Sequence, residues 1–173
     1  MFQAYLFYLV DTILVVTFWK FYHPIVAIQR KKPIEFILMT IHMSLAVTYV
    51  GFPCYFAAGW LASLYMLGNF TLSHTHLPVT ESPKHWVEYA FHHTMDIHGS
   101  WWCDWWMGYL NYQIEHHLFP TMPQFRQRLI HGKVKEFAAT HGLPFHCESY
   151  GKGVELAFQN LRKVASEASK FQQ

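Results

Sequence analysis

The chain has 173 residues, of which 52% are hydrophobic and 18% aromatic, while Asp, Glu, Lys and Arg make up only 14%. This charged fraction is far below the roughly 25% of ordinary soluble domains, and the net charge of +2 without a basic stripe or a known binding motif argues against a nucleic-acid partner. The three cysteines, Cys54, Cys103 and Cys147, form no Cys-x-x-Cys pair, which excludes a zinc ribbon and a disulfide framework.

The first apolar segment, residues 2–19, contains one acidic residue, Asp11. It is about long enough to cross a bilayer, but a buried Asp is costly there, so a spanning helix and an interfacial helix both fit it. The polar stretch from Lys20 to Glu35 follows and contains Arg30-Lys31-Lys32. Positive clusters of this kind favour the cytosolic side, so we expect a cytosolic loop here.

A long uncharged segment comes next. From Phe36 to Thr80 the sequence contains no Asp, Glu, Lys or Arg, and this length accommodates two spans of about 20 residues each. Gly51-Phe52-Pro53 lies near the middle, where glycine and proline favour a turn. The segment therefore predicts a transmembrane helical hairpin over residues 36–72, with both of its ends on the side of the Arg-Lys-Lys cluster.

Residues 73–173 are more polar and are predicted to lie in the cytosol. Ser82-Pro83 is typical of a helix start, and the helix would run to about Ile97 and end at Gly99. The four tryptophans between Ser100 and Tyr109 are typical of an interfacial anchor.

Two amphipathic helices are expected after residue 123, and both are predicted to form a cap on the functional site. The apolar stripe of the first contains Phe125, Leu129, Ile130, Val134 and Phe137. The stripe of the second contains Val154, Ala157, Phe158, Leu161, Val164, Ala165, Ala168 and Phe171.

The segment over residues 111–123 reads Asn-Tyr-Gln-Ile-Glu-His-His-Leu-Phe-Pro-Thr-Met-Pro. On a helix, Gln113, His116 and His117 occupy positions i, i+3 and i+4 and share one face, so an amide oxygen and two imidazoles converge on one point. Imidazole is a good ligand for iron, zinc, copper and nickel. Gln113 can bind a metal directly, hold a metal-bound water, or orient a histidine.

This segment resembles the third histidine box of the membrane-bound front-end fatty acid desaturases, in which Gln replaces the first His of the box. The resemblance extends through Asp104-Trp105-Trp106, through residues 108–112, and back to Ser73-His74. It covers most of the chain but only the C-terminal part of the family pattern, because the two earlier boxes, His-x-x-x-His and His-x-x-His-His, are absent before residue 36. We therefore expect residues 1–173 to be the C-terminal part of a desaturase domain that is inactive alone.

The resemblance also implies the site residues. His74 is similar to the isolated His that the family has between its second and third boxes, so the implied metal ligands are His74, Gln113, His116 and His117. Asp96 occupies a place where the family often has Asn or Asp, and both Asp96 and Asp104 are expected to orient a metal-bound histidine or water. No catalytic residue beyond the ligands and no separate cofactor-binding residue is expected.

The other histidines of the sequence are weaker ligand candidates or none. His76 is a weaker candidate, because the resemblance supports only the first histidine of His74-x-His76. The remaining histidines are given no role in the site: His23, His42, His85, His92, His93, His98, His131, His141 and His146.

The function implied by the resemblance is oxygen-dependent introduction of a double bond into a long-chain, polyunsaturated fatty acyl chain. Two irons would carry the reaction, completed by upstream histidine boxes absent from this chain. Electrons would come from a cytochrome-b-type haem domain or a haem partner protein and its reductase, and the acyl substrate would be held on a phospholipid or on CoA. The implied setting is the endoplasmic reticulum membrane, crossed several times, with the histidine box on the cytosolic face.

The predicted fold class is therefore mainly α: a membrane protein with an interfacial or spanning N-terminal helix, a transmembrane helical hairpin and a cytosolic helical cap that contains the histidine box. Two other functions fit the same residues. One is a non-enzymatic, membrane-anchored metal-binding or interaction protein, which iron content and oxygen-dependent turnover would distinguish. The other is a related di-iron fatty acyl hydroxylase, which differs from a desaturase only in its product.

Overall fold

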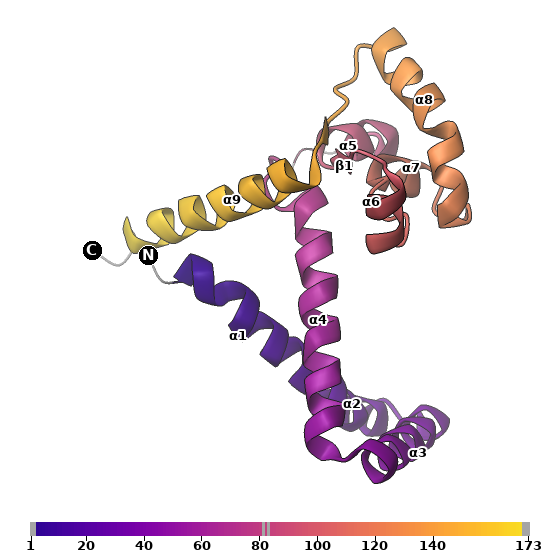
Figure 1. The fold of residues 1–173 in the computed structure, drawn as a ribbon, viewed down its shortest axis with the longest axis vertical. Coiled ribbons are helices and arrows are strands. Elements are labelled where there is room, and N and C mark those ends of the chain that lie inside the picture. Colours follow the sequence, from indigo (N-terminus) through magenta and orange to yellow (C-terminus); the bar gives the residue numbers. More distant parts are fainter. Residues whose placement is uncertain (1–2, 81, 83, 171–173) are drawn as a thin grey trace. The chain divides into compact units, whose positions relative to one another are not determined.

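The computed structural model describes residues 3–80, 82 and 84–170, which form two compact units, Met1–Gly68 and Asn69–Gln173. The described residues are mainly helical, as the sequence predicted (Figure 1). One short parallel sheet, which the sequence did not predict, lies in the second unit. Because the candidate ligands all follow residue 69, the second unit contains the site.

The first unit begins with an unbroken helical stretch. It consists of α1 (Gln3–Thr17), the π-helical turn η1 (Phe18–Tyr22) and α2 (His23–Gln29). The expected polar loop from residue 20 is therefore wrong, since the helix continues to Gln29. The π-turn, in which the His23 amide donates to the Phe18 carbonyl, precedes Pro24 and provides a place for a residue without an amide hydrogen. Phe2, the first residue of the predicted segment, lies outside the described residues.

Two long helices follow, α3 (Pro33–Val50) and α4 (Phe52–His74). The predicted break between them is confirmed at Gly51, whose φ of +80° lies in a region that favours glycine. No residue of α3 is buried, and its apolar side chains such as Leu38 and Tyr49 are exposed. Such a helix suits a lipid environment better than water.

Two described helical stretches are long and apolar enough to cross a membrane: Leu6–Gln29 and Pro33–Val50. The first is longer than the sequence suggested, because η1 and α2 extend it. The predicted returning span, which corresponds to α4, is not among these stretches although it contains no Asp, Glu, Lys or Arg. The transmembrane hairpin over residues 36–72 therefore stays a prediction.

The second unit starts with the last residues of α4 and continues with short elements. These are α5 (Trp86–His92), β1 (Asp96–Ile97), α6 (Trp101–Trp106), α7 (Gln113–Leu118), α8 (Gln124–Thr140), β2 (Cys147–Glu148) and α9 (Tyr150–Lys170). β1 and β2 are parallel, with Asp96 opposite Cys147 and Ile97 opposite Glu148. α7 contacts both α5 and α8 (Figure 1).

The helix predicted from Ser82 to about Ile97 is wrong in its extent. Pro83 lies outside the described residues, and the described helix α5 ends at His92. The backbone that follows donates hydrogen bonds to three distant segments. The Met95 amide donates to the Ser73 carbonyl at 3.0 Å and the Asp96 amide to the His146 carbonyl at 3.0 Å. The Ile97 amide donates to the Asn111 carbonyl at 2.9 Å. These bonds replace the i to i−4 bonds that a helix would have made.

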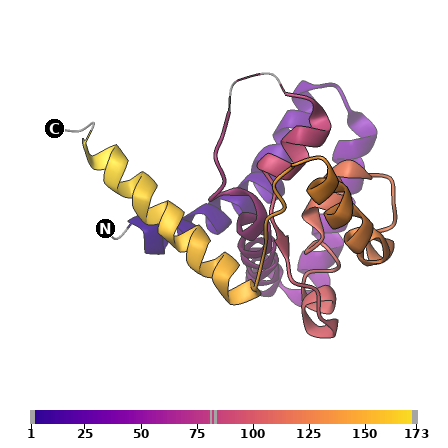
Figure 2. The ribbon, with the colours of Figure 1, turned by 90° about the horizontal axis from the view of Figure 1, so that it is seen from above.

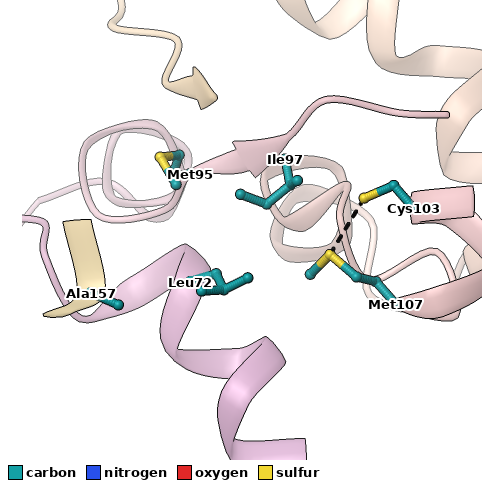
Figure 3. Close-up of a cluster of buried hydrophobic side chains, with 6 residues drawn as sticks. All are labelled: Leu72, Met95, Ile97, Cys103, Met107 and Ala157. Atoms are coloured by element: carbon teal, nitrogen blue, oxygen red, sulfur yellow. Dashed lines mark hydrogen bonds between the residues drawn. The ribbon is translucent and has the colours of Figure 1, made fainter. Parts of the chain in front are cut away.

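The core of the second unit packs around this extended backbone. Figure 3 shows one buried cluster whose side chains come from α4, α9, β1 and α6 and from the residues next to the last two: Leu72, Met95, Ile97, Cys103, Met107 and Ala157. A Cβ at Gly153 would come within 2.9 Å of Ile97 Cδ1, so glycine permits α9 to start close to β1. A second buried cluster joins α5, α7 and α8 through Phe91, Ile114, Leu118 and Val134.

Both predicted C-terminal helices are confirmed as α8 and α9, but the buried face of α8 differs from the prediction. Of the predicted stripe, Val134 is buried and Ile130 is partly buried, but Phe125, Leu129 and Phe137 are exposed. Gln127 and Ala138, which were not in the stripe, are buried. The apolar stripe is thus a poor guide to the side of α8 that faces the core. α9 projects from the rest of the second unit in both views (Figures 1 and 2).

We expect Ile97→Ala to destabilise the second unit by about 2–5 kcal/mol, because it leaves a cavity in a well-packed core. Ile97 has no exposed surface, whereas Val79 is 91% exposed, so Val79→Ala serves as the control. Thermal unfolding of the purified chain in detergent measures the difference. Equal midpoints for the two variants would contradict the packing described here.

Candidate metal centre

The histidine box forms the short helix α7 (Gln113–Leu118), which has two distinct faces. Gln113, His116 and His117 share one face, as their spacing predicted. The opposite face carries Ile114, Glu115 and Leu118, all of which are buried. The helix ends at Leu118 because Pro120 disfavours helical backbone at the residue before it.

His74 lies at the end of α4 and meets this face. Its ring centroid is 5.3 Å from that of His117, with the rings nearly perpendicular, and the His116 and His117 centroids are 5.7 Å apart. The His74 ring is hydrogen-bonded to the side chain of Gln113 and to the backbone of His93. The structure therefore brings together all four residues that the resemblance implied as ligands.

The protonation of these rings suits metal binding, which requires neutral imidazole. Desolvation lowers the pKa of His74 below its usual 6.5, and the nearby His116 lowers it further. The pKa of His117 is lowered by desolvation and by the neighbouring His74 and His116 rings. At neutral pH both rings are thus uncharged and keep a nitrogen lone pair available.

The donor set fits a metal in two further respects. Hydrogen bonds to the backbone of His93 and to the side chain of Gln113 both raise the pKa of His74. A neutral imidazole has one N–H, so the ring donates through one nitrogen and keeps a lone pair on the other. An outer carbonyl of this kind commonly holds a metal-binding histidine in place. The buried Nδ1 of His116 has no hydrogen-bond partner among the described residues. A bound metal ion would supply the partner that this buried nitrogen lacks.

Asp96 and Asp104 were expected to orient a ligand, and both contact the segment that carries the ligands. Asp96 Oδ1 accepts the backbone amide of Ile114 at 2.8 Å, in the first turn of α7. Asp104 Oδ1 accepts from Asn111 Nδ2 at 2.9 Å. Asn111 Nδ2 also lies 3.3 Å from the Ile97 carbonyl, so these residues fix the chain just before α7. Neither carboxylate has a described hydrogen bond to a ligand side chain.

Sequence reasoning missed a cluster of charged side chains behind α7. Glu115 and Asp96 are fully buried, and His131 of α8 places its Nδ1 3.0 Å from Glu115 Oε1 and 3.3 Å from Asp96 Oδ2. Among the described residues, these three form a group of His, Asp and Glu side chains whose ligand atoms all lie within 4.8 Å of one another. The available signal was the pair Gln127 and His131, two polar residues one helical turn apart on the inner face of α8.

The cluster changes the proton affinity of its members. Hydrogen bonds to Asp96 and Glu115 raise the pKa of His131 to about 9. Burial raises the pKa of Asp96 to about 7, opposed by its bond to His131. His131 is therefore a cation at neutral pH and compensates buried negative charge.

The other weak ligand candidate, His76, faces a different environment. Its pKa is lowered by desolvation first, then by His146, and His74 is a smaller influence. Its Nδ1 is buried without a described partner. His76 is thus influenced by the segment before β2 as well as by His74.

An apolar pocket of about 370 Å³ borders α7 on another side. Its walls come from α5, α7 and α8 and the turn between the last two, and comprise Trp86, Val87, Leu118, Phe119, Met122, Ile130, Lys133, Val134 and Phe137. Lys133 is the one charged residue among them. The pocket offers an apolar ligand a surface next to the histidine box.

His131 predicts a pH-dependent stability. Since its folded pKa of about 9 exceeds the usual 6.5, its contribution is fully present below pH 6.5 and is lost as the pH rises through 9. Between pH 6 and pH 9.5 the wild-type chain should lose up to about 3 kcal/mol relative to His131→Gln, since a tenfold change in proton affinity is worth about 1.4 kcal/mol. Thermal unfolding at both pH values measures this, and parallel pH curves would contradict it.

Comparison with known proteins agrees with this geometry. The fatty acid desaturase family matches residues 1–149. An acyl-lipid (8-3)-desaturase of Rebecca salina is 44% identical over 99% of this chain and 43% of its own length, and one from Thraustochytrium sp is 40% identical over 94% of this chain and 40% of its own. The delta(5) fatty acid desaturase fat-4 of Caenorhabditis elegans is 48% identical over 39% of this chain and 15% of its own.

No solved structure significantly matches the chain. The chain spans about two fifths of the length of the first two relatives. The two apolar helices among the described residues are consistent with a membrane protein, and they lie within the matched residues together with the histidine-box segment. The chain belongs to the fatty acid desaturase family, in the front-end group that its Gln-x-x-His-His box indicated.

Proposed function

We propose that this chain supplies the third-box side of the metal centre of a front-end fatty acid desaturase, an oxidoreductase that introduces a double bond into a long-chain fatty acyl group. The observation that carries the proposal is the meeting of His74 with the Gln113, His116 and His117 face of α7. Three imidazoles and one amide lie together there, from two helices whose facing ends, His74 and Gln113, are 39 residues apart in sequence.

The expected group at this site is iron, held by His74, His116 and His117, with Gln113 as a fourth donor or as the residue that orients His74. Bound iron would supply the oxidising power to remove hydrogen from an unactivated methylene, which no amino-acid side chain provides. The protein's residues would hold the donors in place. His93 fixes the His74 ring through its backbone, and Asp96 fixes the start of α7.

Four donors are too few for two irons. The family places two further histidine boxes ahead of this one, so we infer that the remaining donors come from polypeptide outside residues 1–173. On this proposal the chain alone binds metal more weakly than the completed site and does not turn over. Electrons would be delivered by a cytochrome-b-type haem domain or partner and its reductase.

The proposed substrate is an acyl chain in a membrane. The apolar pocket beside α7 supports this substrate class, and so do the exposed apolar helices of the first unit. Two relatives that match nearly the whole chain are named acyl-lipid desaturases, which favours an acyl group on a lipid over an acyl-CoA. The proposed location is the endoplasmic reticulum membrane, with α7 on the cytosolic side.

The topology makes a direct prediction. If residues 36–72 form a membrane hairpin, tags inserted after Lys32 and at the C terminus lie on the same side of the microsomal membrane. Protease should then remove both tags from intact microsomes, while a lumenal control domain stays protected. Protection of one tag but not the other would contradict the predicted hairpin.

The ligand assignment is tested in a full-length desaturase assembled with the two earlier boxes, in a host without the activity. His74→Ala, His116→Ala and His117→Ala should each abolish the unsaturated product and reduce bound iron, because water cannot replace an imidazole at equal strength. Gln113→Ala should cost about 10- to 100-fold if Gln113 acts by orienting His74. Gas chromatography of fatty acids and iron per protein are the measurements.

The matched control is His141→Ala, which removes an exposed histidine at the end of α8. It should leave turnover and iron content unchanged. Full activity in His117→Ala would show that the metal lies elsewhere. Iron bound by these histidines without any oxygen-dependent product would instead favour the non-enzymatic, metal-binding alternative.

A further inference from the structure

The back of α7 is held by a charged cluster that has no place in the histidine-box pattern. Glu115 lies between the candidate ligands in sequence but points to the opposite face of the helix, where it is fully buried. His131 of α8 reaches it at 3.0 Å. A carboxylate on the same helix as three metal donors is thus tied to a neighbouring helix.

Asp96 connects the same cluster to the start of α7. One of its oxygens accepts the Ile114 amide at 2.8 Å, and the other lies 3.3 Å from His131 Nδ1. The first amides of a helix have no partner within the helix, and a carboxylate that accepts one of them stabilises that end. His131 therefore touches both carboxylates that hold α7, one at its first turn and one on its back face.

Burial makes this arrangement sensitive to the loss of the cation. Asp96 and Glu115 have no exposed surface. Glu115 Oε2 lacks a described hydrogen bond, and the one described partner of Asp96 Oδ2 is His131, at ion-pair distance. Two buried carboxylates that lose their positive partner repel one another, and breaking a buried ion pair commonly costs more than the pair contributes. The repulsion is relieved by a proton taken up on Asp96, by movement of Glu115 or by release of Asp96. A protonated Asp96 accepts the Ile114 amide more weakly, and the two movements rotate the donors, so each route loosens the hold on α7.

We propose that His131, through its contacts with Glu115 and Asp96, is a positioning residue that fixes the orientation of α7 and with it the metal donors on the opposite face. This role rests on the proposed metal centre. It differs from general stabilisation because its effect on α7 and on metal binding exceeds its effect on the rest of the second unit. His131 does not itself touch the donors of the site.

The test uses the whole 173-residue chain in detergent and three variants. His131→Gln removes the cation but keeps a hydrogen-bond donor. Glu115→Gln/His131→Gln also removes one buried negative charge, so an amide pair replaces the ion pair. Lys135→Gln is the control, because it removes a positive charge from an exposed position one turn further along α8.

Two measurements are made on each protein. Hydrogen exchange read by mass spectrometry reports on the peptide that contains residues 113–118, with α9 as an internal reference. Binding of Co²⁺, followed by its visible absorption, reports on the donors, and His117→Ala defines the part of the signal that belongs to the site. Cobalt is the probe because it accepts the same imidazole ligands as iron and has a spectrum sensitive to their arrangement.

His131→Gln should speed exchange in α7 about tenfold or more while α9 is unchanged. It should also weaken His117-dependent Co²⁺ binding by about 10- to 100-fold, the usual cost of losing an outer partner of a ligand. The double variant should recover most of both losses, and Lys135→Gln should match the wild-type chain. Recovery in the double variant also shows that the single variant failed through its uncompensated charges.

Three results would overturn the proposal in different ways. Unchanged α7 exchange in His131→Gln would overturn the positioning role alone. Faster exchange throughout the second unit, α9 included, would show a general loss of stability and would also overturn it. Co²⁺ binding that His117→Ala leaves unaltered would overturn the metal centre proposed above, and the role of His131 in positioning donors would end with it.

Discussion

A helix of six residues cannot hold metal donors by its own hydrogen bonds, because isolated helices shorter than about 12–15 residues are marginal in water. α7 has this length, so its stability has to come from what surrounds it. The first turn is held by Asp96, the back face by Ile114 and Leu118 in the core and by Glu115 in an ion pair. The extended backbone of β1, which lies where a helix was expected, brings Asp96 to that position.

The metal-donor face of α7 was predictable from the sequence, and the contacts of its opposite face were not. The first depends on local helical spacing, and the second depends on how two helices pack. Gln113, His116 and His117 lie within five residues, so helical spacing alone places them together. Likewise, the break at Gly51 follows from a local preference for positive φ. His131 meets Glu115 only because α8 packs on α7, and no periodicity in either helix specifies that contact.

Tertiary contacts also explain the other errors of the sequence-based description. The helix expected up to Ile97 gives way to β1 because carbonyls from three distant segments compete for its amides. Phe125 and Leu129 look like core residues on α8 but are exposed, whereas the polar Gln127 is buried. In the first unit, composition indicated a loop from Lys20, but the helix continues through Lys20 as a π-turn and then through Pro24 as α2.

The parallel pairing of β1 with β2 has a consequence for the order of events during synthesis. Asp96 can cap α7 only when β1 is in place, and β1 is held by the His146 carbonyl and by Cys147 of β2. Both residues emerge from the ribosome after the whole histidine box and after α8. The donors thus leave the ribosome on a segment whose support has not yet been made, and premature capture of a metal ion by the nascent chain would meet a flexible, non-selective set of imidazoles. Selectivity for the metal would arise late, when the C-terminal strand docks.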